Sequence, residues 1–152
     1  MDLKCSNILT DEEGNIKLCD FGSSREFKKG SSNGSSSFTS LQSQILGSVQ
    51  WMAPEVINEE GTGSKSDIWS LGCTIVEMFV GGNPWGEKID DQNLYQAQQT
   101  ITNSDVLPSI PSTANVSKNC EEFLALCLTR DYKRRPSAFE LLSHPWMMQE
   151  DS

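Results

Sequence analysis

The alternation of apolar and polar residues near the start of the chain predicts a small β-hairpin. In residues 16–19, Ile16 and Leu18 face one side and the other two residues face the opposite side, which is the two-residue period of a strand. Residues 7–9 precede this strand, and the acidic stretch 10–15 between them has the composition of a turn.

In the second half of the chain, apolar residues recur at helical spacing. The longest apolar run is residues 68–80, which follows Ser66, a predicted N-cap, and stops at the glycine–proline stretch 81–84. This run predicts a buried helix over 67–80. Further helices are predicted at 53–57, at 91–101, from Ser117 onward, and from a capping box of Ser137 and Glu140 to about residues 144–146.

Residues 23–52 differ in composition from both halves. Ten of these thirty residues are serine, and the stretch 30–37 contains no apolar side chain. Such a segment cannot bury itself, so it predicts a flexible loop between the hairpin and the helices.

These elements indicate an α+β fold that is mainly α, with a small hairpin at one end. Strands and helices do not alternate, which disfavours a parallel sheet. The net charge of −9 disfavours binding to nucleic acid or to anionic membranes. No apolar run approaches the about 20 residues that a membrane span needs, and residues 1–15 lack the apolar stretch of a signal peptide.

The five cysteines are irregularly spaced, odd in number and without a C-x-x-C pair. This pattern favours reduced thiols in a cytoplasmic or nuclear protein, with a disulfide framework as the alternative. We expect a cytoplasmic location.

Three oxygen-bearing side chains, Asp2, Asn7 and Asp20, flank the predicted hairpin. Carboxylate and amide oxygens suit Mg²⁺, which proteins usually hold with one or two carboxylates plus substrate phosphates. With Lys4 as a nearby positive charge, the set is compatible with phosphoryl transfer. The alternative is that Asp and Asn simply populate turns.

Five short motifs occur in the order found in protein kinases, and the chain resembles that family over essentially its whole length. DLKCSN resembles the end of the kinase catalytic loop, DFG the metal-binding motif, and APE the end of the activation segment. The motifs lie at residues 2–7, 20–22, 53–55, 67–72 (DIWSLG) and 134–138 (RRPSA).

The resemblance implies a partial kinase domain over residues 1–148, namely the C-terminal lobe, followed by a tail at 149–152. Within it, residues 2–7 would be the catalytic loop, 20–55 the activation segment and 56–148 the helical subdomain. The segment ILGSVQWMAPEVI most resembles mitogen-activated protein kinase kinase kinases, although VQWMAPE also resembles tyrosine kinases.

The resemblance also implies roles, with ATP and Mg²⁺ as cofactors. Asp2 would accept the proton of the substrate hydroxyl, and Lys4 would stabilise the transferring phosphoryl group. Asn7 and Asp20 would hold Mg²⁺. Ser48 would contact the catalytic Asp and Lys, where serine/threonine kinases usually carry a threonine.

Other motif residues are implied to be structural. Glu55 would pair with Arg135, and Asp67 would accept hydrogen bonds from the catalytic-loop backbone; the alternative is that Glu55 and Asp67 are solvated acids at helix ends. Cys19 would border the nucleotide pocket, or else pack inertly.

The serine-rich segment would be the activation loop, where phosphorylation can order a loop against arginines. The alternative is an unmodified linker. The candidates for phosphorylation are Ser36, Ser37, Thr39, Ser40 and Ser43.

The sequence contains neither the Gly-rich loop nor the strand lysine of a kinase N-terminal lobe. We therefore expect the N-terminal lobe to be absent, these residues alone to be inactive, and an apolar face to be exposed where that lobe would pack. The predicted function is a truncated serine/threonine kinase acting on a protein substrate, with a downstream kinase in a signalling cascade as the candidate. The alternatives are a non-catalytic binding or regulatory module and an unrelated helical protein.

Overall fold

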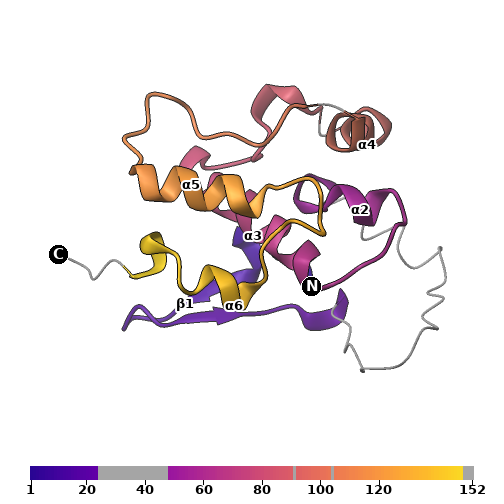
Figure 1. Ribbon diagram of the computed structural model, residues 1–152. Coiled ribbons are helices and arrows are strands. Elements are labelled where there is room, and N and C mark those ends of the chain that lie inside the picture. The colour runs from indigo at the N-terminus through magenta and orange to yellow at the C-terminus, as the bar shows by residue number, and fades with distance from the viewer. Residues whose placement is uncertain (24–47, 91, 104, 149–152) are drawn as a thin grey trace.

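The chain opens with the predicted antiparallel hairpin, in a computed structural model that describes residues 1–23, 48–90, 92–103 and 105–148 (Figure 1). After a 3-10 turn at Cys5–Asn7, strand β1 (Ile8–Thr10) pairs with β2 (Ile16–Leu18). The intervening turn is closed by the Asp11 carboxylate, whose Oδ1 accepts from the backbone N–H of Asn15 at 2.8 Å. The hairpin prediction is confirmed.

Helix α3 (Ser64–Val80) is the long helix expected from the apolar run, but it begins earlier than predicted. Gly63, with extended backbone, is its N-cap, so Ser66 lies inside the first turn and is not the cap. The Ser66 hydroxyl instead donates to Glu55 Oε1 at 2.9 Å. The helix ends as predicted at Gly81, whose φ of +69° is the left-handed conformation that glycine adopts readily.

The remaining helices confirm most of the predicted positions. Helix α4 (Leu94–Asn103) starts later than expected, because Asn93 Oδ1 accepts from the Gln96 N–H at 3.0 Å and so caps the first turn. At the other end of the chain, Pro145 prevents the last helix from reaching residue 146. Ser117 caps α5 as predicted. The bounds are α2 Pro54–Ile57, α4 Leu94–Asn103, α5 Lys118–Cys127 and α6 Ala138–Leu141, with 3-10 turns at Phe21–Ser23, Val49–Trp51, Gly86–Lys88 and Pro145–Met148.

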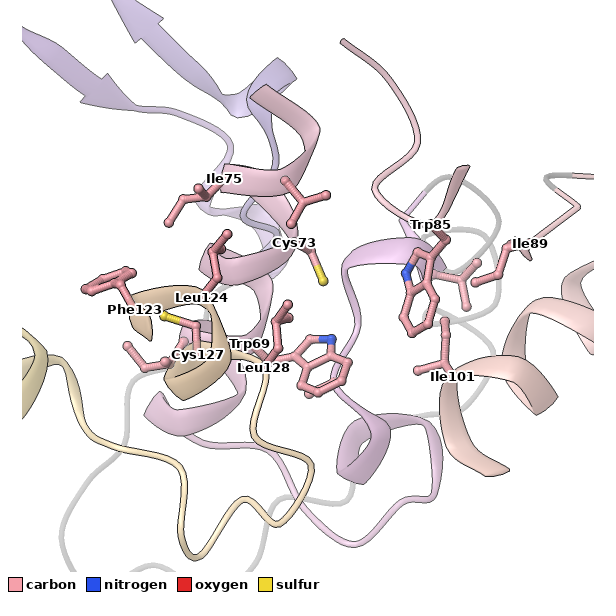
Figure 2. Packing of buried hydrophobic residues seen from close by; sticks show 14 of the residues in the cluster. Trp69, Cys73, Ile75, Trp85, Ile89, Ile101, Phe123, Leu124, Cys127 and Leu128 are labelled. Atoms are coloured by element: carbon pink, nitrogen blue, oxygen red, sulfur yellow. The ribbon is translucent and has the colours of Figure 1, made fainter. Parts of the chain in front are cut away.

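Helix α3 lies at the centre of the core and packs against α5, α6 and the Val49–Trp51 turn, while α4 packs against α2 and that same turn. Figure 2 shows Trp69 and Cys73 of α3 among the buried side chains of this cluster. The approach of α3 to α5 requires a glycine, because a Cβ on Gly72 would lie 2.9 Å from the Cys127 Cβ. The helical part therefore forms a closely packed frame.

Apolar side chains of the hairpin and of the end of α3 are exposed to solvent. Ile16 is 68% exposed, Leu9 55% and Met78 57%. Exposed apolar surface was expected on this chain. Among the described residues, no helix combines the length and the apolar character needed to cross a bilayer.

The predicted serine-rich loop, at residues 24–47, and the tail at 149–152 lie outside the described residues. All five cysteines are free thiols, as the reduced-thiol reading requires. Burial raises the pKa of the Cys127 thiol to about 12 and raises that of Cys73 as well, so both are poor nucleophiles.

Candidate active site

Asp2, Lys4 and Ser48 form a closed cluster of polar side chains. The Lys4 ammonium lies 3.0 Å from Asp2 Oδ2 and donates to the Ser48 hydroxyl at 2.7 Å. The hydroxyl in turn donates to Asp2 Oδ2 at 3.1 Å. The structure thus brings together two residues before the hairpin and one residue that is 44 positions from Lys4 in the sequence.

The cluster keeps access to solvent. About a fifth of each charged side chain is exposed, 22% for Asp2 and 19% for Lys4, whereas Ser48 is buried. A carboxylate held by an ammonium and a hydroxyl has a fixed orientation, and it can still reach a molecule arriving from outside. This arrangement can accept a proton and place a positive charge beside the acceptor.

Asn7 connects this cluster to the segment that carries Asp20. Its Nδ2 donates to the Asp2 backbone carbonyl at 2.8 Å and to Asp2 Oδ2 at 3.4 Å. The backbone carbonyl of Asn7 accepts from the Cys19 N–H at 2.9 Å, which extends the hydrogen-bond ladder of the hairpin by one step. The hairpin therefore brings the residue before Asp20 alongside the loop of Asp2.

Asp20 has a backbone conformation that is uncommon for a residue with a side chain, with φ of +57°. Its Oδ1 accepts from the Gly22 N–H at 3.3 Å, and the side chain is exposed. Strained, exposed residues of this kind cluster at functional sites. Cys19, directly before it, is half-buried.

The side chains of Asn7 and Asp20 carry oxygen atoms of the chemical type that Mg²⁺ binds. Within the described part of the chain, no group of three or more His, Cys, Asp or Glu side chains could hold a metal. An all-protein cage is therefore not formed there. One carboxylate and one amide suit Mg²⁺ that is completed by phosphate oxygens and waters.

Glu55 and Arg135 form a buried, bidentate ion pair. Arg135 Nη1 donates to Glu55 Oε1 at 2.7 Å, and Nη2 donates to Oε2 at 3.0 Å. The side chain of Arg135 is 0% exposed and that of Glu55 is 4% exposed. The remaining donors of Arg135 are used by backbone carbonyls, including those of Thr129 and Lys65. The guanidinium also lies 5.2 Å from the ring centroid of Trp69.

Asp67 lies beside the start of the loop that carries Asp2. Its Oδ1 accepts from the main-chain nitrogen of Met1 at 2.9 Å. The sequence-predicted residues Asp2, Lys4 and Ser48 are thus in direct contact with one another, and Asn7 is bonded to Asp2. Glu55 with Arg135 and Asp67 with Met1 form separate contacts. The predicted phosphorylation positions Ser36, Ser37, Thr39, Ser40 and Ser43 lie outside the described residues.

Sequence reasoning missed one residue next to the cluster, Glu77 of α3. Its Oε2 accepts from the Cys5 backbone N–H at 2.9 Å and from the Trp51 indole N–H at 2.8 Å. The signal was a single acid inside the apolar run 68–80, because a charge in such a place needs a partner.

Comparisons with known proteins agree with the motif order. A family model described as "Protein kinase domain" matches residues 1–147. Mitogen-activated protein kinase kinase kinase A of Dictyostelium discoideum is 45% identical over 150 residues, which are 99% of this chain and 14% of that protein. Serine/threonine-protein kinase STE11 of Saccharomyces cerevisiae is 37% identical over 146 residues, or 96% of this chain and 19% of its own length.

Mitogen-activated protein kinase kinase kinase 19 of Homo sapiens is 40% identical over 147 residues, which are 96% of this chain and 10% of that protein. The chain therefore spans about a tenth to a fifth of the length of these three relatives. Because the family model covers nearly every residue, the chain belongs to the protein kinase family and resembles the mitogen-activated protein kinase kinase kinases.

Proposed function

We propose that the chain is the C-terminal lobe of a serine/threonine protein kinase, with the kinase domain ending near residue 148. The observation that supports this most strongly is the contact of Asp2, Lys4 and Ser48, three residues that the kinase motifs single out and that meet from distant parts of the sequence. A module that only binds partners has no need of this cluster.

In this proposal Asp2 acts as the proton acceptor. The hydroxyl oxygen of a protein serine or threonine attacks the γ-phosphorus of ATP, the bond from that phosphorus to the bridging oxygen breaks, and the hydroxyl proton passes to Asp2. Lys4 stabilises the charge on the transferred group. Ser48 holds the Asp2 carboxylate through its 3.1 Å hydrogen bond.

Asn7 and Asp20 are proposed to hold Mg²⁺, which neutralises charge on the phosphates when bound. Asn7 is fixed for this role by its hydrogen bonds to Asp2, and Asp20 by its left-handed backbone. Cys19 is placed at the edge of the nucleotide site. These assignments are supported by the donor chemistry of the two side chains.

We propose that the substrate is a protein, namely a downstream kinase in a mitogen-activated signalling cascade. Two of the relatives carry the name mitogen-activated protein kinase kinase kinase, which supports this order of action. A cytoplasmic location remains a prediction, and the five free thiols are compatible with it. Activation by phosphorylation between Ser36 and Ser43 is proposed on the same resemblance.

The test is transfer of radiolabelled phosphate from ATP to a generic protein substrate by the full natural chain. We expect the unaltered protein to be active and Asp2→Asn to lose about 10²–10⁴-fold in kcat, the range associated with a positioned general base. Asp105→Asn, which makes the same change at an exposed site, should match the unaltered protein. Equal activity of the Asp2 variant would refute the assignment.

A binding or regulatory module is the second candidate, and the exposed apolar side chains of the hairpin favour it. Residues 1–152 alone should transfer no phosphate, because the sequence has no Gly-rich loop to cover the phosphates. If the full natural chain were also inactive with ATP and Mg²⁺, the binding module would become the better account.

A further inference from the structure

Three polar side chains form a stripe along one face of the central helix α3, at Ser70, Thr74 and Glu77. Positions separated by four and three residues lie on the same face of a helix. The Ser70 hydroxyl donates to the Trp51 carbonyl at 2.7 Å, and the Thr74 hydroxyl lies 3.2 Å from the Leu3 carbonyl, which it can reach as a donor. The stripe thus faces both segments that supply the catalytic cluster.

Glu77 connects these two segments through a single oxygen atom. Oε2 accepts from the Cys5 N–H, next to Lys4, and from the indole N–H of Trp51, three residues after Ser48. Both bonds, at 2.9 and 2.8 Å, join a charged acceptor to a neutral donor, which makes them stronger than ordinary hydrogen bonds. Lys4 is therefore one residue, and Ser48 three residues, from a residue that donates to the same carboxylate.

We propose that Glu77 is a positioning residue for phosphoryl transfer: its carboxylate fixes the loop of Lys4 relative to the segment of Ser48, and so fixes the Asp2–Lys4–Ser48 cluster. The inference rests on the proposed kinase function. Glu77 acts on Lys4 and Ser48 indirectly, through its bonds to Cys5 and Trp51. Burial, together with a hydrogen bond that the thiol donates to Glu77, raises the pKa of the Cys5 thiol to about 11, so Cys5 serves here through its backbone.

The consequence is a specific effect on the rate of the chemical step. Without the carboxylate, the Cys5 amide and the Trp51 indole lose their common acceptor, and the two segments can shift relative to each other. A misplacement of about 1 Å can cost about 100-fold in rate. Asn7 and Asp20 remain joined through the hairpin ladder, so nucleotide binding should change little.

The kinetic experiment measures kcat and the KM for ATP in the full natural chain. We expect Glu77→Ala to lower kcat about 10–100-fold with KM within about threefold. Glu77→Gln, whose amide oxygen can accept both bonds, should recover most of the loss, and Trp51→Phe, which removes one bond, should fall between. Glu87→Ala, the same change at an exposed position, should behave as the unaltered protein.

The geometric half of the inference has a readout without activity, the hydrogen exchange of the Cys5 amide measured by NMR. Glu77→Ala should accelerate this exchange, whereas Glu77→Gln and Glu87→Ala should leave it slow. Unchanged protection in Glu77→Ala, or a kcat within twofold of normal in that variant, would overturn the inference. An inactive unaltered protein would instead overturn the proposed function, and the exchange data would still decide whether Glu77 holds the loop.

Discussion

Two ion pairs join the segment 48–55 to other parts of the molecule, one through Glu55 and the other through Ser48. The two pairs differ in their access to water. Arg135 and Glu55 are 0% and 4% exposed, and the guanidinium is surrounded by further acceptors. In the other pair, Lys4 and Asp2 are 19% and 22% exposed and share Ser48. The first pair is closed to any ligand, and the second is open to one.

This difference separates stability from chemistry. A buried pair gives no access to substrate, but removing one partner leaves a charge stranded in the interior. A partly exposed pair contributes little to stability, since water and neighbouring groups replace the lost partner. We therefore expect substitutions at the Glu55 end of the segment to unfold the protein and substitutions at the Ser48 end to affect catalysis.

The largest effect on stability is expected from Arg135→Ala. Loss of the guanidinium strands Glu55 in the core, so the free energy of unfolding should fall by about 3–5 kcal/mol. Urea unfolding followed by tryptophan fluorescence measures this change. Arg134→Ala removes the same side chain at an exposed neighbouring position and should change little. Similar stability of both variants would erase the distinction between the two pairs.

Gly72→Ala tests the frame that holds the buried pair. The new methyl group would lie about 2.9 Å from the Cys127 Cβ and from a Leu128 methyl group, so α3 and α5 must separate. We expect a loss of about 1–3 kcal/mol, the usual cost of overpacking. The measurement is the thermal unfolding midpoint. The control is the same substitution at Gly82, where an added Cβ would have no heavy atom within 4 Å.

Ser137→Ala should have a smaller effect on stability, because Ser137 lies two residues after Arg135 but takes no part in the ion pair. The Ser137 hydroxyl accepts from the Glu140 N–H at 3.3 Å and forms half of the capping box of α6. Losing it should cost about 1 kcal/mol in the free energy of unfolding. Ser137→Thr, which keeps the hydroxyl, should recover most of this loss, and a cost equal to that of Arg135→Ala would be unexpected.

The smallest effect on stability is expected from Lys4→Ala. Asp2 keeps the hydrogen bonds from Ser48 and Asn7, so the free energy of unfolding should change by less than about 1 kcal/mol. Lys17→Ala on the exposed strand β2 provides the matched comparison in the same urea titration. A loss of several kcal/mol at Lys4 would mean that the open pair is also a structural one.

Local signals in the sequence predicted local structure well. The hairpin follows from two-residue alternation, and the caps at Ser117 and Ser137 follow from hydroxyl groups that bond within their own first turn. Ser66 is not the cap because the helix begins two residues earlier, at Ser64. Its hydroxyl accepts from the Gly63 N–H and donates to Glu55, a tertiary contact that propensity does not contain. The last helix was predicted to reach about residues 144–146, whereas α6 ends at Leu141, because Pro145 disfavours helical backbone in the residue before it.

The candidate site was only partly accessible from the sequence. Motif order singled out Asp2, Lys4 and Ser48, whereas their mutual distances depend on folding of a long intervening segment. Glu77 could not have been assigned in advance, since one of its partners is the backbone N–H of Cys5, 72 residues away, and any residue offers such a donor. Tertiary structure was needed to find it.

The most direct test of the division between the two pairs is to measure kcat and the free energy of unfolding together for Asp2→Asn and Glu55→Gln. The account predicts that Asp2→Asn loses at least about 100-fold in kcat while its stability changes by less than about 1 kcal/mol. Glu55→Gln should lose stability first, by several kcal/mol. An Asp2 variant that keeps its kcat, or that loses as much stability as the Glu55 variant, would contradict the account.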